Sequence, residues 1–558
     1  MGPDGGCAGD YCPIVDAITL IDGTNGLNGS HKCVQQSNGS INRQELANSM
    51  NGKSKRQLNG QNGRQIYISD RKEEPPLYLE ILCYISYAVL IIFGYLRDFL
   101  RKIRLEKTRG AVESHREGYV PLYQSFESFF TRNIYRRVCD GCNRPITCVP
   151  GAEIDVMDRV TNDYNWTFEY PGTTTRAINM GSYNYLGFAE NEGTNVDRVE
   201  GVLHKYGVGV GATRHELGTI DIQRELELRL AQFLGVESSI VFGMGFATNS
   251  TNIPTLASKG CLIISDEYNH ASIILGSKKS GASVAVFKHN DMKDLERKIR
   301  DNIINGQENS HRAWKKIIII VEGIYSMEGT IINLPEIIKL KLKYRCYVYL
   351  DEAHSIGAIG RRGRGVSDYF GCDPKDIDLW MGTFTKSFGA AGGYIAGRKQ
   401  LIDYIAVHSQ SATYATSIAP CIAQQIMSVI NVIMGVDGTH DGQMRIARLS
   451  RNARYFRRRL KQLGFVVYGN DDSPVVPIMI CFCSKISAVV RTAFTKGIGT
   501  VGAAFPATPL TTGRVRFCVS ASHTKEMLDK ALRVMDEIGD QVAIKYSKQP
   551  KSCEKIIY

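Results

Sequence analysis

Short apolar runs alternate with amphipathic segments across the middle of the chain. Runs such as Ile317–Glu322 and Tyr347–Leu350 are apolar at almost every position, which indicates strands buried on both faces of a sheet. Between them, apolar residues recur at helical spacing, as at Leu226, Leu230 and Phe233. Strands that alternate with helices predict a doubly wound α/β domain with its ligand site along one edge of the sheet.

The pattern changes towards both ends of the chain. The first 70 residues are rich in Gly, Asn, Ser and Gln without an apolar period, so we expect them to be disordered. Beyond about Ile426, a helix, a basic stretch and strands such as Val475–Ile480 predict a smaller α/β domain. The predicted divisions are a tail (1–70), a membrane helix with its basic flank (71–110), an arm (111–187), a large domain (188–425), a small domain (426–546) and a second tail (547–558).

One apolar stretch has the length of a membrane helix. Leu77–Leu96 carries Glu80 as its only charge and is close to the ~20 residues that a helix needs to cross a bilayer. The basic residues that follow are Arg97, Arg101, Lys102, Arg104, Lys107 and Arg109. Since basic flanks stay on the cytosolic side, the body of the protein is expected to face the cytosol. A spanning or deeply embedded helix is predicted, with a buried core helix or an interfacial helix as the alternatives.

Composition narrows the class of protein. The net charge of +12 is spread without the aromatic interleaving of an RNA-recognition motif, so we predict no nucleic-acid partner. It suits acidic membrane surfaces or the phosphates of coenzyme A. The fifteen cysteines are typical of reduced cytosolic thiols. Cys139-x-x-Cys142 with Cys148 has a zinc-like spacing but lacks a second pair, so we predict no metal.

Two residues near strand ends point to a specific chemistry. Lys386 follows an apolar segment that ends at Met381, and hydroxyls precede it at Thr383 and Thr385. A lysine with a depressed pKa can hold an aldehyde cofactor as a Schiff base, while the hydroxyls bind a phosphate. Asp351 ends the strand Tyr347–Leu350, where a carboxylate can bond a pyridine nitrogen and keep it protonated. Together these demands describe pyridoxal phosphate.

With this ordered pair, the sequence from about Tyr119 to Tyr546 resembles the α-oxoamine synthases. These are pyridoxal-phosphate enzymes that join an amino acid to an acyl-CoA with loss of carbon dioxide. The resemblance implies the type I fold of pyridoxal-phosphate transferases, with a large doubly wound domain and a small C-terminal α/β domain. It also implies Lys386, His270 and Asp351 as the catalytic residues.

The resemblance assigns further residues to the cofactor. His270 should stack on the pyridine ring, while Ser326 and His354 should lie near its phenolic oxygen. The turn that opens a helix after Phe242 should hold the phosphate, because exposed amides at a helix N-terminus bind anions. Its candidates are Gly245, Phe246 and Thr248, with Thr383 and Thr385 from the lysine segment and Thr416 and Ser417 reaching the partner subunit's phosphate.

Substrate contacts are also implied. Asn184 should reach the amino-acid carboxylate, although an asparagine in a tight turn is the plain alternative. Arg516 is the better match to the arginine that forks onto that carboxylate, and Arg514 is its rival. Thr508 lies in a Pro-Ala-Thr-Pro loop, which here follows Ala504-Phe505, where some bacterial relatives carry an arginine.

The activity that the resemblance implies is condensation of L-serine with palmitoyl-CoA to a long-chain 3-keto base on the endoplasmic reticulum membrane. It also implies a heterodimer with a related subunit that lacks the lysine, with small regulatory membrane subunits as further partners. A relative that uses glycine and a shorter acyl-CoA would keep the same cofactor residues. A silent scaffold of the same fold would lack the lysine, which this chain has.

Overall fold

The computed structural model describes residues 57–59, 65–67, 73, 75–106, 118–120, 125–549 and 556–558. The chain forms two compact units, Met1–Arg71 and Lys72–Tyr558, which we describe separately. In the first unit, β1 (Gln57–Asn59) pairs antiparallel with β2 (Gln65–Tyr67). The other residues of the tail expected to be disordered lie outside the described residues, as do Lys107 and Arg109 of the basic flank.

The second unit contains a seven-stranded sheet. From edge to edge its strands are β5 (Ser238–Phe242), β11 (Gly393–Gly397), β10 (Leu379–Thr383), β9 (Tyr347–Asp351), β8 (Ile317–Glu322), β6 (Leu262–Asp266) and β7 (Ser283–Phe287). β11 is antiparallel to both of its neighbours, and the other neighbouring strands pair in parallel. The strands expected from the apolar runs are therefore confirmed, and β9 and β10 include Asp351 and Thr383.

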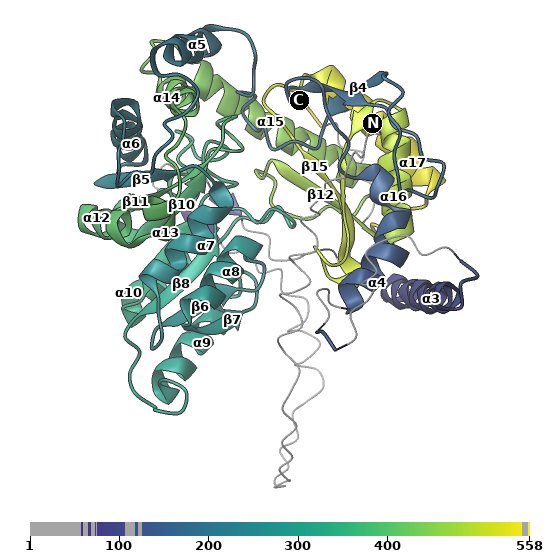
Figure 1. Cartoon of the computed structure of the whole chain (residues 1–558), viewed down its shortest axis with the longest axis horizontal. Helices are drawn as coiled ribbons and strands as arrows, with labels where there is room; N and C mark the ends of the chain where they lie inside the picture. Colours follow the sequence, from purple (N-terminus) through teal and green to yellow (C-terminus); the bar gives the residue numbers. More distant parts are fainter. Residues whose placement is uncertain are drawn as a thin grey trace. The chain divides into compact units, whose positions relative to one another are not determined.

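Helices bury the faces of this sheet (Figure 1). Ile318 and Ile320 of β8 pack in one cluster with Ile253 and Ile402, which lie on helices. The intervening residue Ile319 is also fully buried, so both faces of β8 are covered and the continuous apolar run is explained. The helices of this region are α5 (Thr194–Tyr206), α6 (Asp221–Leu234), α7 (Gly245–Leu256), α8 (Ala271–Ser280), α9 (Met292–Asn305), α10 (Leu334–Tyr344), α11 (Gly365–Phe370), α12 (Lys399–His408), α13 (Gln410–Tyr414) and α14 (Pro420–Met434), with the 3-10 turn η3 (Pro374–Asp376).

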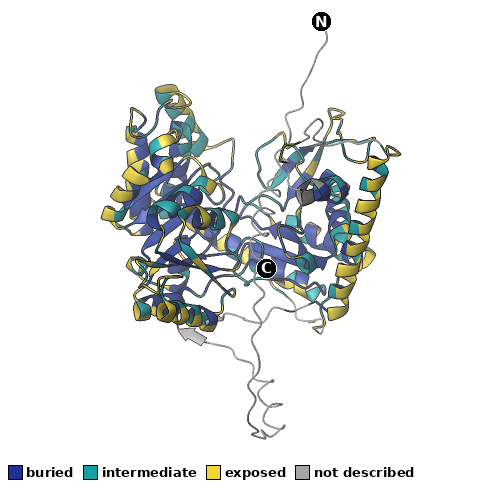
Figure 2. Ribbon diagram, turned by 60° about the horizontal axis from the view of Figure 1, so that its bottom comes forward, coloured by how far each residue is buried: buried dark blue, intermediate teal, exposed yellow. Residues whose placement is uncertain are grey.

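Two three-stranded sheets form the rest of the unit. One is antiparallel, with β12 (Val475–Cys481), β15 (Gly513–Cys518) and β14 (Val501–Ala503); the other contains β3 (Glu153–Met157), β4 (Thr174–Asn179) and β13 (Ile498–Gly499). Their helices are α4 (Ser125–Asn133), α15 (Asp441–Gln462), α16 (Cys483–Thr495) and α17 (Lys525–Gln541), with the 3-10 turns η1 (Tyr135–Arg137), η2 (Cys139–Gly141) and η4 (Leu510–Thr512). Figure 2 shows buried strands and exposed outer helix faces. The expected fold class is confirmed, and the division into a large and a small domain stays a prediction.

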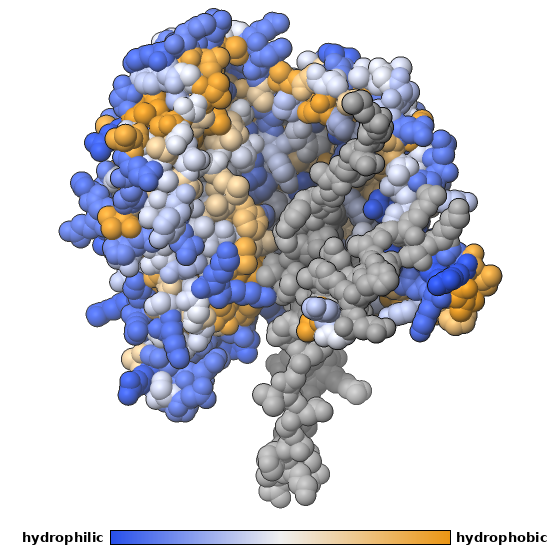
Figure 3. Space-filling view, in the orientation of Figure 1, coloured by the Kyte–Doolittle hydropathy of each residue, from blue (hydrophilic) through white to orange (hydrophobic). Residues whose placement is uncertain are grey.

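The helix expected over Leu77–Leu96 is present as α3 (Leu77–Lys102), which is long and apolar enough to cross a membrane. One of its faces packs on the protein: the Cys83 thiol donates to the main-chain oxygen of Leu510 at 3.3 Å. A Cβ at Gly94 would come within 2.5 Å of the Phe129 ring, so only glycine allows this approach to α4. The other face exposes large apolar side chains such as Ile92, which is 65% exposed, and Figure 3 shows an orange patch at α3.

Candidate active site

Polar residues gather where the parallel strands end. β8 ends in Glu322, β9 in Asp351 and β10 in Thr383, and in the strand register Asp351 lies beside both Glu322 and Met381. His270 follows the end of β6. Because the carboxyl ends of parallel strands share one edge of a sheet, residues far apart in sequence meet there. The sheet therefore brings together His270, Asp351 and the lysine segment, as the sequence predicts.

Lys386 lies just after β10 and is half-buried. Its Nζ is 3.4 Å from the hydroxyl of Thr383 and 5.7 Å from the ring centre of Tyr183. Desolvation lowers the pKa of Lys386 to about 8, while the nearby Asp351 carboxylate opposes this shift. A lysine amine with such a pKa is partly neutral near pH 8, as a nucleophile or general base requires.

Asp351 is held rigidly at the end of β9. It is only 3% exposed; Oδ1 accepts from the Ala353 amide at 2.9 Å, and Oδ2 accepts from the Asn249 side chain at 2.8 Å. Asn249 in turn accepts from the Tyr349 hydroxyl at 2.7 Å. The sequence analysis assigned no role to Asn249. Its hydrogen bond to Asp351 joins residues about a hundred positions apart, so no local sequence pattern predicts it.

The two histidines present different surroundings. His270 caps the N-terminus of α8, and its Nδ1 lies 2.7 Å from the Ser272 hydroxyl and accepts from the Ser272 amide. Desolvation lowers the pKa of His270, Asp351 opposes this shift, and the charge of Lys386 adds to it. His354 is buried, and its Nδ1 lies 2.8 Å from the hydroxyl of Tyr185. Burial holds the pKa of His354 well below 6.5, so both imidazoles are neutral near pH 7.

A helix begins at the turn expected to bind the cofactor's phosphate. α7 begins at Gly245 after β5 and has no acidic residue in its first turn. A Cβ at Gly245 would come within 2.8 Å of Thr383, so glycine brings the helix start against the lysine segment. Thr385 is exposed and donates to the Thr383 hydroxyl at 3.3 Å. The hydroxyl of Thr248 points back along the helix and donates to the main-chain oxygen of Met244.

The two candidate arginines differ in their partners. Arg514 donates to Glu328 at 3.0 Å, to the main-chain oxygen of Met327 at 2.7 Å and to that of Thr512 at 2.9 Å. Arg516 has no carboxylate partner among the described residues, and its buried Nε has no acceptor there. Its guanidinium lies 4.7 Å from the ring centre of Tyr183, the ring that Lys386 also approaches. Arg516 is therefore the one of these two arginines without a carboxylate partner among the described residues.

Other predicted site residues differ in whether their side chains already have hydrogen-bond partners. The side chain of Asn184 holds its own turn: it donates to the Pro150 oxygen and accepts from the Ala189 amide. Its predicted contact with substrate stays a prediction. Thr508 and Ser417 each have a buried hydroxyl without a partner among the described residues. Thr416 bridges to Thr213, so its segment lies beside the glycine-rich loop that precedes α6.

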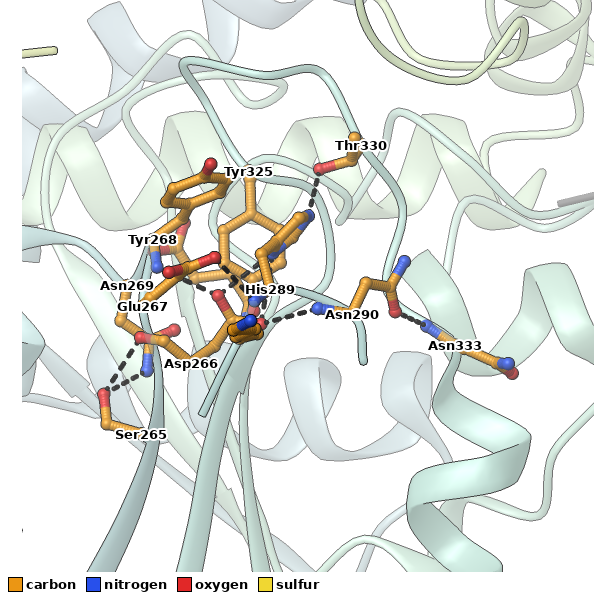
Figure 4. Close-up of polar contacts among 12 residues, drawn as sticks. Ser265, Asp266, Glu267, Tyr268, Asn269, His289, Asn290, Tyr325, Thr330 and Asn333 are labelled. Atoms are coloured by element: carbon orange, nitrogen blue, oxygen red, sulfur yellow. Dashed lines mark hydrogen bonds and ion pairs between the residues drawn. The ribbon is translucent and has the colours of Figure 1, made fainter. Parts of the chain in front are cut away.

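A polar network supports the loop that follows β8 (Figure 4). His289 joins Asp266 at 3.0 Å through Nδ1 and Thr330 at 2.7 Å through Nε2, and its ring packs edge-on against Tyr325. This fixes the segment whose Ser326 oxygen lies 3.5 Å from Arg516. The sequence assigned Ser326 a role but missed the network, because its members come from separate strand ends.

The described residues contain no group of three candidate metal ligands. Cys139 and Cys142 direct their sulfurs to main-chain oxygens, and Cys148 accepts from the Asp155 amide.

The arrangement fits pyridoxal phosphate. It offers an amine with a lowered pKa, a rigid carboxylate, a helix N-terminus for a phosphate and a buried arginine Nε without an acceptor. These groups come from different elements and meet at one sheet edge, which is the usual place for a ligand in this class of fold.

Comparisons with known proteins agree with this arrangement. The family model described as aminotransferase class I and II matches residues 175–535. Serine palmitoyltransferase 3 of Homo sapiens is 51% identical and covers 96% of this chain and 97% of its own; serine palmitoyltransferase 2 of Caenorhabditis elegans is 52% identical and covers 84% of each. A serine palmitoyltransferase structure from S. paucimobilis, solved with PLP and myriocin, superposes with a TM-score of 0.65 at 26% identity, covering 75% of this chain and all of that one.

Proposed function

The chain belongs to the serine palmitoyltransferases within the class I and II aminotransferase family, and we propose that it is the catalytic, lysine-bearing subunit of such an enzyme. Its cofactor is pyridoxal phosphate. The reaction joins L-serine to palmitoyl-CoA, with release of coenzyme A and carbon dioxide, and gives 3-ketosphinganine, the first intermediate of sphingolipid synthesis. One observation carries the proposal: the amine of Lys386 and the carboxylate of Asp351 are both held at the carboxyl edge of the sheet.

Bound pyridoxal phosphate supplies an electron sink for negative charge at the substrate's α-carbon. Asp351, whose two oxygens are held by Asn249 and Ala353, would keep the ring nitrogen protonated, because a nearby negative charge favours the protonated form. His270 would orient the ring by stacking, and the amides at the start of α7, with the hydroxyls of Thr383 and Thr385, would bind the phosphate. The neutral His354 can donate a hydrogen bond to the phenolic oxygen.

Lys386 acts twice. Its amine holds the cofactor before serine arrives, and afterwards Nζ is free to accept the proton from the α-carbon of serine. A bond then forms between this carbon and the acyl carbonyl carbon, and the thiolate of coenzyme A leaves. Loss of the carboxyl group as carbon dioxide leaves a carbanion, to which a proton returns.

The substrate assay tests the proposal. Purified protein with its partner subunit should release coenzyme A with serine and palmitoyl-CoA, and much less with glycine or acetyl-CoA. Preference for glycine and acetyl-CoA would replace this function with that of a sister α-oxoamine synthase. A protein that does not bind pyridoxal phosphate would instead be a scaffold.

Arg516 is proposed to hold the serine carboxylate, so Arg516→Ala should raise the KM for serine at least about tenfold, the effect of losing charge-assisted hydrogen bonds. The melting temperature should fall less than in Arg514→Ala, because the change leaves no buried carboxylate without its cation; it removes a contact with Tyr183 and long contacts with Ser326 and Met327. Steady-state kinetics and a thermal scan measure both quantities.

Arg514→Ala is the matched comparison. It leaves Glu328 buried without its cation, which typically destabilises a protein by about 3–5 kcal/mol, so the melting temperature should fall. A serine KM that responds to Arg514 alone would reverse the two assignments.

We place the protein on the endoplasmic reticulum membrane with its catalytic body in the cytosol. α3 docks on the protein through Cys83 and Gly94 and exposes an opposite face that includes Ile92 and Phe93. A helix with one protein-bound face and one apolar face suits a position embedded along the membrane surface. Lys102 and Arg104 near its end are exposed and suit the acidic headgroups of the cytosolic leaflet. Extraction of the full chain from membranes by carbonate would contradict this placement.

A second subunit is proposed to cover the site. Val208, Leu217 and Tyr414 are 73%, 90% and 78% exposed, on two segments that the Thr213–Thr416 bridge joins. Large apolar side chains on loops beside a site are typical of a subunit interface. The partner proposed is the related, lysine-free serine palmitoyltransferase subunit 1, with small regulatory membrane subunits around α3. Identification of the chains that co-purify from membranes tests this composition.

A further inference from the structure

A second buried carboxyl lies beside Asp351, and none of the roles above uses it. Glu322 ends β8, is 4% exposed and is in register with Asp351 on the neighbouring strand. Its Oε1 accepts from the main-chain amide of His270 at 2.5 Å. The described residues offer it no ion pair, although Lys386 lies close enough to act on it electrostatically. The hydrogen bond from the His270 amide is the principal polar contact of its side chain.

The hydrogen bond to Glu322 fixes the main chain of His270, whereas the hydrogen bonds of the imidazole fix only the ring. The bonds from the ring to Ser272 set its orientation relative to the first turn of α8. The bond from the His270 amide to Glu322 ties the start of α8 to the end of β8. The side chain of Asn269 also donates a hydrogen bond to the main-chain oxygen of Ile320 at 2.8 Å. The start of α8 would therefore stay attached to β8 in a variant that lacks the Glu322 carboxyl.

The surroundings of Glu322 favour its neutral form. Desolvation and the negative charge of Asp351 raise the pKa of Glu322 well above its ordinary value. The other charged groups that act on it are Asp266 at the end of β6, which has the same effect as Asp351, and Lys386 after β10, which opposes it. Two carboxyls that share a buried site rarely both ionise, and Asp351 is the one with two donors fixed on it.

We propose that Glu322 is a positioning residue that acts as a neutral carboxyl: its carbonyl oxygen sets the height of His270 over the cofactor ring, and its lack of charge leaves Asp351 as the single anion at the ring nitrogen. The inference rests on the proposed function, since the height of an imidazole matters only above an aromatic cofactor.

The isosteric change Glu322→Gln and the truncation Glu322→Ala together test this role in the full chain with its partner subunit. Glutamine keeps the acceptor oxygen and the neutral state, so exchange of the serine α-proton should stay within about threefold of the parent. Alanine removes the acceptor, and exchange should slow at least about tenfold, as small misplacements at active sites do. The circular dichroism of the bound cofactor should be parent-like in the glutamine variant and altered in the alanine variant.

A pH titration of the cofactor's absorbance shows whether Glu322 acts as a neutral or as a charged group. The pH midpoint of the visible absorbance should be unchanged in Glu322→Gln, because no charge is removed next to Lys386. A glutamine variant as slow as the alanine variant, or with a shifted midpoint, would overturn the neutral role. An alanine variant with parent-like exchange and dichroism would overturn the positioning role. A parent protein that binds the cofactor but exchanges no serine proton would overturn the proposed function itself.

Discussion

Lys386→Ala should abolish turnover and the visible absorbance of lysine-bound cofactor, because this one amine both holds the cofactor and removes the α-proton. Absorbance spectra and coenzyme A release with serine and palmitoyl-CoA measure the two losses. Lys399→Ala is a suitable control, since Lys399 is exposed on α12 and its amine pairs with the exposed carboxylate of Asp403. Substantial remaining turnover in Lys386→Ala would exclude the assignment.

The pH dependence of cofactor capture gives an independent measurement of the same amine. Desolvation lowers the pKa of Lys386 to about 8, so the neutral, nucleophilic form grows as the pH rises through 8. Capture of pyridoxal phosphate by the apoprotein should therefore speed up through pH 8 and level off above it. A rate that keeps rising towards the ordinary lysine pKa of about 10.4 would show that Lys386 is not desolvated as described.

The second large effect is expected at Asp351. Asp351→Ala should slow exchange of the serine α-proton by at least about a hundredfold, because an unprotonated pyridine is a much weaker electron sink. Asp351→Asn separates charge from shape, since asparagine keeps an oxygen that can accept from Asn249 or Ala353. It should retain most of the stability and lose most of the exchange.

A surface carboxylate provides the comparison for Asp351. Asp403→Asn removes a carboxylate that is 59% exposed, and its exchange rate should match the parent. Deuterium exchange at the α-carbon of serine, followed by mass spectrometry, measures all three variants. Near-normal exchange in Asp351→Asn would contradict a charged partner for the ring nitrogen.

The sequence predicted those features that depend on local pattern. The apolar run Ile317–Glu322 indicated a doubly covered strand, and β8 has these bounds. Asp351 could be placed at a strand end because it directly follows an apolar run, and Lys386 and His270 because each comes a few residues after one. The glycine turn before α7 could be recognised because a helix N-terminus has its own local signature.

The sequence could not predict contacts between distant segments. Tyr185 and His354 are 169 residues apart, and no sequence pattern near either residue predicts their hydrogen bond. The same holds for the choice between Arg514 and Arg516, which alternate on one strand. Only the structure shows that Glu328 pairs with Arg514, whereas Arg516 has no carboxylate partner among the described residues.

By itself, then, the sequence determined the order of strands and helices and the chemical groups at the strand ends, because periodicity and strand boundaries are properties of neighbouring residues. The tertiary structure decided which of those groups are desolvated, which are already paired and on which face α3 docks. The lowered pKa of Lys386, the raised pKa of Glu322 and the Nε of Arg516 without an acceptor among the described residues all follow from burial by segments remote in the chain.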